Sequence, residues 1–123
     1  MQEEKTKVLL IDDSVFMLSM ISAMLKDTEF QVIDTAKNGA EGLQKYKDLK
    51  PDIVLLDIVM PDERGDETLL KILDYDPDAK IVMVSSLGTQ EKVVESLKRG
   101  AKNFIQKPFE RDDILRILKG VVK

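Results

Sequence analysis

The stretch Pro51-Asp-Ile-Val-Leu-Leu-Asp57-Ile-Val-Met-Pro-Asp-Glu-Arg-Gly65 decides the fold of this chain. Its apolar run, Ile53 to Leu56, is short, unbroken and bounded by turn signals, which is typical of a strand buried on both faces of a parallel sheet. Asp57 ends the run, at the carboxyl edge where open α/β sheets place their ligand sites. Met60-Pro61 then interrupts regular structure, and Gly65 permits a turn into the next helix. Taken alone, Asp57 is more simply the first residue of a loop, because aspartate is common in turns.

The composition excludes several classes of function. The chain has 123 residues, enough for one domain with a hydrophobic core. It has no cysteine and no histidine, which removes disulfides, thiolate zinc sites and the usual Ser-His and Cys-His nucleophile pairs. A bound metal therefore needs oxygen ligands, which favours magnesium, calcium or manganese. With a net charge of −4, no basic run and no apolar run long enough to span a bilayer, we expect a cytoplasmic protein that binds neither nucleic acid nor membrane.

Strand and helix patterns alternate five times along the chain, with no linker, repeat or low-complexity segment between them. Alternation of this kind predicts an α/β fold with one doubly wound parallel sheet. The predicted strands are 8–11, 31–36, 52–57, 80–84 and 103–106. The predicted helices are 15–26 after the cap Ser14, Asn38 to about Asp48, 66–75, the Thr89 cap to Arg99, and one from about Arg111.

Polar residues stand at the ends of the predicted strands. Asp12 and Asp13 follow the first, Asp57 the third, Ser85 the fourth and Lys107 the fifth. Right-handed crossovers place all strand ends on one edge of the sheet. If the first and third strands are neighbours, about 4.8 Å apart, the carboxylates crowd together and a hard divalent cation would relieve their repulsion. A lysine and a hydroxyl beside that cation would suit a phosphoryl group.

In this order, Asp12-Asp13, Asp57 with Met60-Pro61 and Gly65, Ser85, and Lys107-Pro108 resemble the receiver domain of two-component response regulators. The resemblance covers essentially the whole chain, so we expect residues 1–123 to form a single receiver domain. It implies a CheY-like, flavodoxin-like fold: a five-stranded parallel sheet of order 2-1-3-4-5, doubly wound with five helices.

The resemblance also implies the chemistry of the acidic residues. Asp57 would be the phosphoacceptor, taking a phosphoryl group from a sensor histidine kinase or phosphotransfer protein as an acyl phosphate. Asp13 and Asp57 would ligate Mg²⁺ directly, together with the backbone carbonyl of Val59, and Mn²⁺ could substitute. Asp12 would act through a water. The protein would be a phosphoacceptor signalling protein, with no enzymatic activity beyond its own phosphorylation and dephosphorylation.

The remaining roles belong to the switch. Lys107 would pair with the phosphoryl oxygens, and the Lys107-Pro108 bond would be cis. Ser85 would move to bond the phosphoryl group, and Phe104 would change rotamer with it. The face formed by the fourth helix, fifth strand and fifth helix would then change and control a downstream protein target. A homodimer is one form that the phosphorylated protein could take.

Smaller features favour a chemotaxis-type member of the family: the Asp-Asp-Ser start, Phe16-Met17 and Leu87-Gly88-Thr89-Gln90. Because the sequence stops just after the last predicted helix, we expect a stand-alone receiver. Several alternatives stay open at this point. A receiver module cut from a longer transcriptional or enzymatic regulator would look the same. A magnesium-dependent aspartyl phosphatase would need a second aspartate where Ser14 stands, and a flavin carrier would need a hydroxyl-rich phosphate loop. An inert pseudo-receiver would lack a site residue, and none is missing.

Two departures from the family pattern carry hypotheses of their own. Val59 and Leu87 are apolar at positions that influence hydrolysis of the acyl phosphate in the family, so we expect a long-lived phosphorylated state. The segment 15–25 is apolar on nearly all sides. It is therefore either deeply buried or a contact surface for a partner or a second copy.

Overall fold

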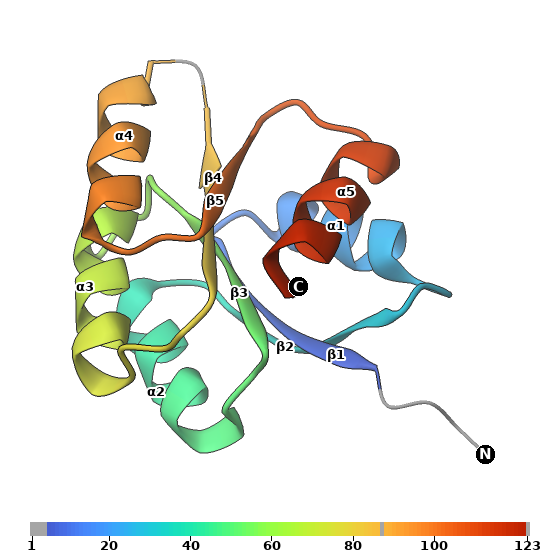
Figure 1. Cartoon of the computed structure of the whole chain (residues 1–123), viewed down its shortest axis with the longest axis horizontal. Helices are drawn as coiled ribbons and strands as arrows, with labels where there is room; N and C mark the ends of the chain where they lie inside the picture. Colours follow the sequence, from blue (N-terminus) through green and yellow to red (C-terminus); the bar gives the residue numbers. More distant parts are fainter. Residues whose placement is uncertain (1–4, 87, 123) are drawn as a thin grey trace.

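The computed structural model describes residues 5–86 and 88–122, and its elements alternate as the sequence predicts (Figure 1). The element ends differ from the predicted ones by no more than one or two residues. The strands are β1 (Thr6–Ile11), β2 (Phe30–Ala36), β3 (Ile53–Asp57), β4 (Ile81–Ser85) and β5 (Asn103–Gln106). The helices are α1 (Val15–Leu25), α2 (Gly39–Leu49), α3 (Gly65–Tyr75), α4 (Gln90–Arg99) and α5 (Arg111–Val122).

The five strands form one parallel sheet in the order β2-β1-β3-β4-β5, which confirms the order implied by the family resemblance. β1 lies between β2 and β3, so the segment after β1 is next to the segment after β3. All strands run the same way, and their carboxyl ends therefore share one edge of the sheet. This arrangement brings residues from the first, middle and last parts of the chain together.

The sheet separates two hydrophobic layers, because successive side chains of a strand point to opposite faces. Helices α1 and α5 cover one face of the sheet, and α2, α3 and α4 cover the other (Figure 1). On β1, Val8 and Leu10 belong to the first layer, whereas Leu9 and Ile11 belong to the second. Every residue of β3 and β4 is buried, as expected for central strands covered on both faces. Each fully buried aliphatic side chain contributes about 1.5–3 kcal/mol, so these two strands anchor the edge where the polar residues gather.

Helix α1 is buried on one side only. Leu18, Ile21 and Leu25 pack into the core, whereas the side chains of Val15 and Phe16 are 59% and 73% exposed. The helix is therefore not deeply buried, and its exposed apolar side chains favour the contact-surface interpretation. Whether a partner or a second copy covers them stays a prediction.

Side chains cap the first two helices, and Ser14 does so as predicted. The Ser14 hydroxyl accepts a hydrogen bond from the Met17 amide at 3.2 Å, and the Asn38 side chain accepts one from the Glu41 amide at 2.8 Å. Each bond satisfies an amide that has no partner within its helix. Within residues 5–86 and 88–122, no helix is both long and apolar enough to cross a membrane.

Candidate functional site

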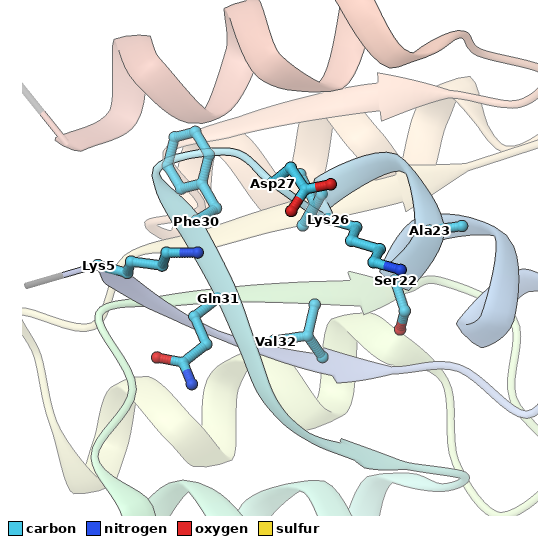
Figure 2. A pocket seen from close by; sticks show the side chains of 9 residues that line it. Lys5, Ser22, Ala23, Lys26, Asp27, Phe30, Gln31 and Val32 are labelled. Atoms are coloured by element: carbon cyan, nitrogen blue, oxygen red, sulfur yellow. The ribbon is translucent and has the colours of Figure 1, made fainter.

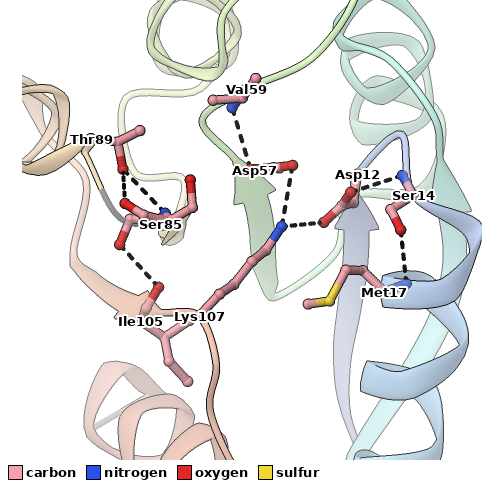
Figure 3. Close-up of polar contacts among 10 residues, drawn as sticks. Asp12, Ser14, Met17, Asp57, Val59, Ser85, Thr89, Ile105 and Lys107 are labelled. Carbon is pink, nitrogen blue, oxygen red and sulfur yellow. Dashed lines mark hydrogen bonds and ion pairs between the residues drawn. The ribbon is translucent and has the colours of Figure 1, made fainter.

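An open cleft of about 370 Å³ lies at the carboxyl edge of the sheet. Its walls come from the ends of β1, β3, β4 and β5 and the segments that follow them, and they include Asp12, Asp13, Asp57, Ser86 and Lys107. Figure 3 shows Asp12, Asp57 and Lys107 of this group. The topology alone explains this meeting, because neighbouring parallel strands end side by side. The cleft is therefore the place where the residues predicted from separate strand ends can act together.

A second hollow, of about 500 Å³, lies between α1 and β2 (Figure 2). Lys5, Ser22, Lys26 and Gln31 line it, and Asp27 is the one acidic residue among the described residues of its wall. It is larger than the cleft at the strand ends but holds no cluster of carboxylates. Among the described residues, the cluster of three carboxylates lies in the cleft and not in this hollow.

Three carboxylates converge in the cleft. Asp12, Asp13 and Asp57 each offer an oxygen, and these oxygens lie within 4.8 Å of one another. Asp12 and Asp57 are buried, with 2% and 6% of their surface exposed, and Asp13 is exposed. Unscreened like charges at such separations repel one another, and oxygen ligands are those that Mg²⁺ prefers. The donor set fits a hard divalent cation of this kind.

The environment of Asp57 disfavours its ionised form. Burial and, to a lesser extent, the neighbouring Asp12 carboxylate raise the pKa of Asp57 from its ordinary value of 3.8 to a net value of about 6. The Lys107 ammonium and the hydrogen bond from the Val59 amide, at 3.3 Å, act in the opposite direction. A cation in the cleft would stabilise the ionised carboxylate that a nucleophile needs.

Lys107 reaches across the sheet edge to both buried acids. Its Nζ lies 3.5 Å from Asp12 Oδ2 and 3.5 Å from Asp57 Oδ2 (Figure 3). Its backbone amide donates to the Ser85 carbonyl at 2.8 Å, which fixes the start of this segment on β4. The Lys107-Pro108 bond is cis, as the resemblance implied. One ammonium balances only part of the charge of three carboxylates, so the cleft stays attractive to a further cation.

The serines at the end of β4 differ in what they face. Ser85 is buried, and its hydroxyl donates to the Ile105 carbonyl over a long 3.4 Å, whereas Ser86 lines the cleft. Thr89 does not cap α4 with its side chain, contrary to the prediction. Its hydroxyl instead donates to the Ser86 carbonyl at 2.7 Å and accepts from the Ser86 amide at 3.1 Å (Figure 3). Sequence reasoning missed the place of Ser86 in the cleft, although the tandem serines were its available signal.

Val59 and Phe104, two further predicted residues, differ in whether they line the cleft. The Val59 side chain lines the cleft and is 58% exposed. Phe104, on β5, is 37% exposed and lines a separate hollow with residues of α5, so it is not part of the cleft. Leu87 lies outside the described residues. The structure thus brings the acids, Val59 and Lys107 together, with Ser85 buried beside them.

Comparisons with known proteins agree with this geometry. The family profile of the response regulator receiver domain matches residues 8–119. Over 117 residues, the chain is 47% identical to a chemotaxis protein CheY of Listeria monocytogenes and 42% identical to one of Thermotoga maritima; each match covers 95% of this chain and 98% of the relative. It also superimposes on the structure described as the CheX-CheY-BeF3-Mg²⁺ complex of Borrelia burgdorferi, with a TM-score of 0.90 at 39% identity, covering 95% of this chain and 89% of that one.

The doubly wound sheet, the acidic cleft and the profile match define a receiver domain, and the chain belongs to the response regulator receiver family of two-component signalling proteins. Within that family it is of the CheY, chemotaxis-like type.

Proposed function

We propose that this protein is a response regulator that a sensor histidine kinase or phosphotransfer protein phosphorylates on Asp57. The observation that supports the proposal most directly is the position of the Asp57 carboxylate. It is buried at the end of the central strand, 3.5 Å from the Lys107 ammonium and within reach of two further carboxylates. The proposal treats residues 1–123 as one receiver domain.

In the proposed reaction a carboxylate oxygen of Asp57 attacks the phosphorus of a phosphohistidine on the donor. An O–P bond forms on Asp57, the N–P bond of the donor breaks, and the donor imidazole leaves with the electron pair. Lys107 pairs with the phosphoryl oxygens and offsets their charge. Bound Mg²⁺ would supply further neutralisation of the transferred group.

The residues that would hold the cation are those the cleft brings together. Asp13 and Asp57 would bind it directly, with the backbone carbonyl of Val59, and Asp12 would act through a water. Mn²⁺ has the same preference for oxygen ligands and could replace Mg²⁺. The structure described as a CheX-CheY-BeF3-Mg²⁺ complex holds this metal in a protein 39% identical to this chain, which supports the assignment.

Phosphorylation then changes the surface of the protein. Ser85 leaves its long hydrogen bond to Ile105 and bonds the phosphoryl group, while Phe104 changes rotamer. The weak 3.4 Å bond and the 37% exposure of Phe104 are compatible with such a movement. The altered face of α4, β5 and α5 controls a downstream protein target in chemotaxis-type signalling, and the phosphorylated form can pair as a homodimer.

The test is to incubate the protein with Mg²⁺ and a small acyl-phosphate donor and to weigh it intact. We expect one phosphoryl adduct on the wild type, none on Asp57→Asn, and none when EDTA removes the metal. Asp48→Asn is the matched control, because Asp48 is an exposed aspartate on α2, away from the cleft, and this variant should keep the adduct.

An adduct that persists on Asp57→Asn would contradict the assignment of the nucleophile. If no adduct forms on the wild type, phosphorylation by a kinase and binding of beryllofluoride are the next measurements. Failure of both would mean that the protein signals without phosphate.

A further inference from the structure

The loop from β3 to α3, residues 58–64, carries Val59 and is closed tightly at its base. The Gly65 amide donates to the Ile58 carbonyl at 2.6 Å. A Cβ at position 65 would overlap the carbonyl oxygen of Asp57, so this close approach requires glycine. The two ends of the loop are therefore fixed against the end of β3.

Asp62 ties the middle of this loop to a different helix. Its Oδ1 accepts a hydrogen bond from the Gly39 amide at 3.0 Å, and its Oδ2 accepts one from the Ala40 amide at 3.1 Å. These amides are at the start of α2, 23 and 22 residues earlier in the chain. The bonds to Gly39 and Ala40 hold the pKa of Asp62 below its usual value, as expected for a carboxylate at a helix N-terminus.

The first backbone amides of α2 donate hydrogen bonds to side chains from two different segments. Amides in the first turn of a helix have no acceptor within the helix. Asn38 serves the Glu41 amide, as the local cap, and Asp62 serves the Gly39 and Ala40 amides. The two hydrogen bonds that Asp62 accepts therefore satisfy amides of α2 and also join this helix to the loop 58–64.

Glu63 fixes the same loop on its other side. Its side chain, 11% exposed, accepts from the Thr68 hydroxyl at 2.7 Å and pairs with Lys71 Nζ at 2.6 Å, both on α3. A Cβ at Gly39 would overlap Glu63, which shows how closely the loop lies on the first turn of α2. Asp62 and Glu63 thus hold the loop between two helices.

We propose that Asp62 is a positioning residue for the metal site: by holding the loop on α2, it keeps the Val59 carbonyl available to the cation. This inference rests on the proposed function. Mg²⁺ requires near-ideal octahedral ligands at about 2.0–2.1 Å, so a carbonyl on a loosened loop is a poor ligand. The buried Met60 and the fixed φ of Pro61 lie between Val59 and Asp62, and they transmit the restraint over a short distance.

The test compares four variants of the full chain. Asp62→Ala removes both acceptors, and Asp62→Asn keeps one carbonyl acceptor. Asn38→Ala removes the local cap of α2 but leaves the loop attached. Glu41→Gln removes a negative charge from the same helix end without touching the loop. Mg²⁺ affinity is measured by titration calorimetry, and the exchange rate of the Val59 amide is measured by NMR.

Asp62→Ala should weaken Mg²⁺ binding by about 10-fold, as residues that orient metal ligands do, and should speed exchange of the Val59 amide. Asp62→Asn should recover part of the affinity, and it is the informative variant if Asp62→Ala does not fold. Asn38→Ala should lower the unfolding temperature yet keep the wild-type affinity, and Glu41→Gln should also bind as the wild type does.

Two results would overturn the inference while leaving the proposed function intact: wild-type affinity in Asp62→Ala and Asp62→Asn, or an equal loss in Asn38→Ala. The first would make Asp62 only a helix cap, and the second would trace the effect to the stability of α2. An equal loss in Glu41→Gln would assign it to charge and would also overturn the inference. A wild type that binds no Mg²⁺ would overturn both proposals.

Discussion

Asp57 has a carboxyl group whose ionisation works against the fold. Burial and the Asp12 carboxylate raise its pKa from 3.8 to about 6, so the folded state holds the proton more tightly than the unfolded state does. Where the folded state binds more protons, stability falls as pH rises. The stabilising contribution is therefore complete below about pH 4, and it is lost as pH rises through about 6.

The first prediction follows from this loss of stability with rising pH. Without divalent metal at pH 7, Asp57→Asn should be more stable than the wild type, by on the order of 2 kcal/mol, because the neutral amide avoids the cost of a buried charge. Near pH 4 the two proteins should unfold at the same urea concentration, since the wild-type carboxyl is then protonated too. Asp48→Asn, at an exposed position, should match the wild type at both values. Equal stability of wild type and Asp57→Asn at pH 7 would contradict the raised pKa.

A second prediction concerns Val59, whose exposed side chain lies over the cleft and offers no hydrogen bond to an attacking water. Val59→Asn should lose the phosphoryl group several-fold faster than the wild type, because an amide can orient that water. The measurement is the decay of the intact-mass adduct after the donor is removed. Val94→Asn, at a 50% exposed valine of α4, is the control. Decay of Val59→Asn no faster than that of the wild type would count against the hypothesis.

At the level of residues, the sequence predicts those site positions that strand ends determine. Asp12, Asp13, Asp57 and Lys107 end apolar runs, and parallel topology then places them together. A side-chain orientation at the end of a strand depends on rotamer and loop, so the different surroundings of Ser85 and Ser86 were not predictable. The hydrogen bonds of Asp62 join segments more than 20 residues apart in the chain, so no local sequence pattern predicts them.

At the level of elements, α1 shows the limit of hydrophobic patterning. An apolar stripe identifies the buried side of a helix only when the other side is polar. Here both sides are apolar, so the sequence left the buried side undetermined, and the structure assigns it to Leu18, Ile21 and Leu25. Thr89 stands at the predicted N-cap position of α4, but its hydroxyl bonds the backbone of Ser86 and makes no side-chain cap to the helix.

The third prediction tests this division of α1. Leu18→Ala should destabilise the protein by about 2–5 kcal/mol, as truncation of a fully packed side chain does. Phe16→Gln should change stability by less than about 0.5 kcal/mol, because this side chain is 73% exposed. Urea unfolding measures both. A loss in Phe16→Gln as large as that in Leu18→Ala would mean that Phe16 is covered in solution.

At the level of the whole molecule, the strand order creates the site. The alternation of strands and helices predicts a parallel sheet, whereas the adjacency of β1 and β3 follows only from the family resemblance. Local sequence does not encode which strands are neighbours, since that depends on the packing of all helices at once. In the observed order, β1 pairs with both β2 and β3, and the acids after β1 and β3 meet. The unfolded chain has no such cluster, so a cation that binds it favours the folded state.

The fourth prediction uses this coupling. Mg²⁺ should raise the unfolding temperature of the wild type, with a stabilisation of about 2.7 kcal/mol at 100 times its dissociation constant, and EDTA should reverse the rise. Asp13→Asn and Asp57→Asn should respond weakly. Sodium chloride at matched ionic strength is the control, because it screens the carboxylates without binding them. An equal rise with sodium chloride would mean that screening of the carboxylates, and not Mg²⁺ binding, stabilises the protein. Without metal Asp57→Asn should be the more stable protein, but it should gain less stability from Mg²⁺. The wild type should therefore approach or overtake it as Mg²⁺ is added. Such convergence would tie the raised pKa of Asp57 and the metal site to the same carboxylate.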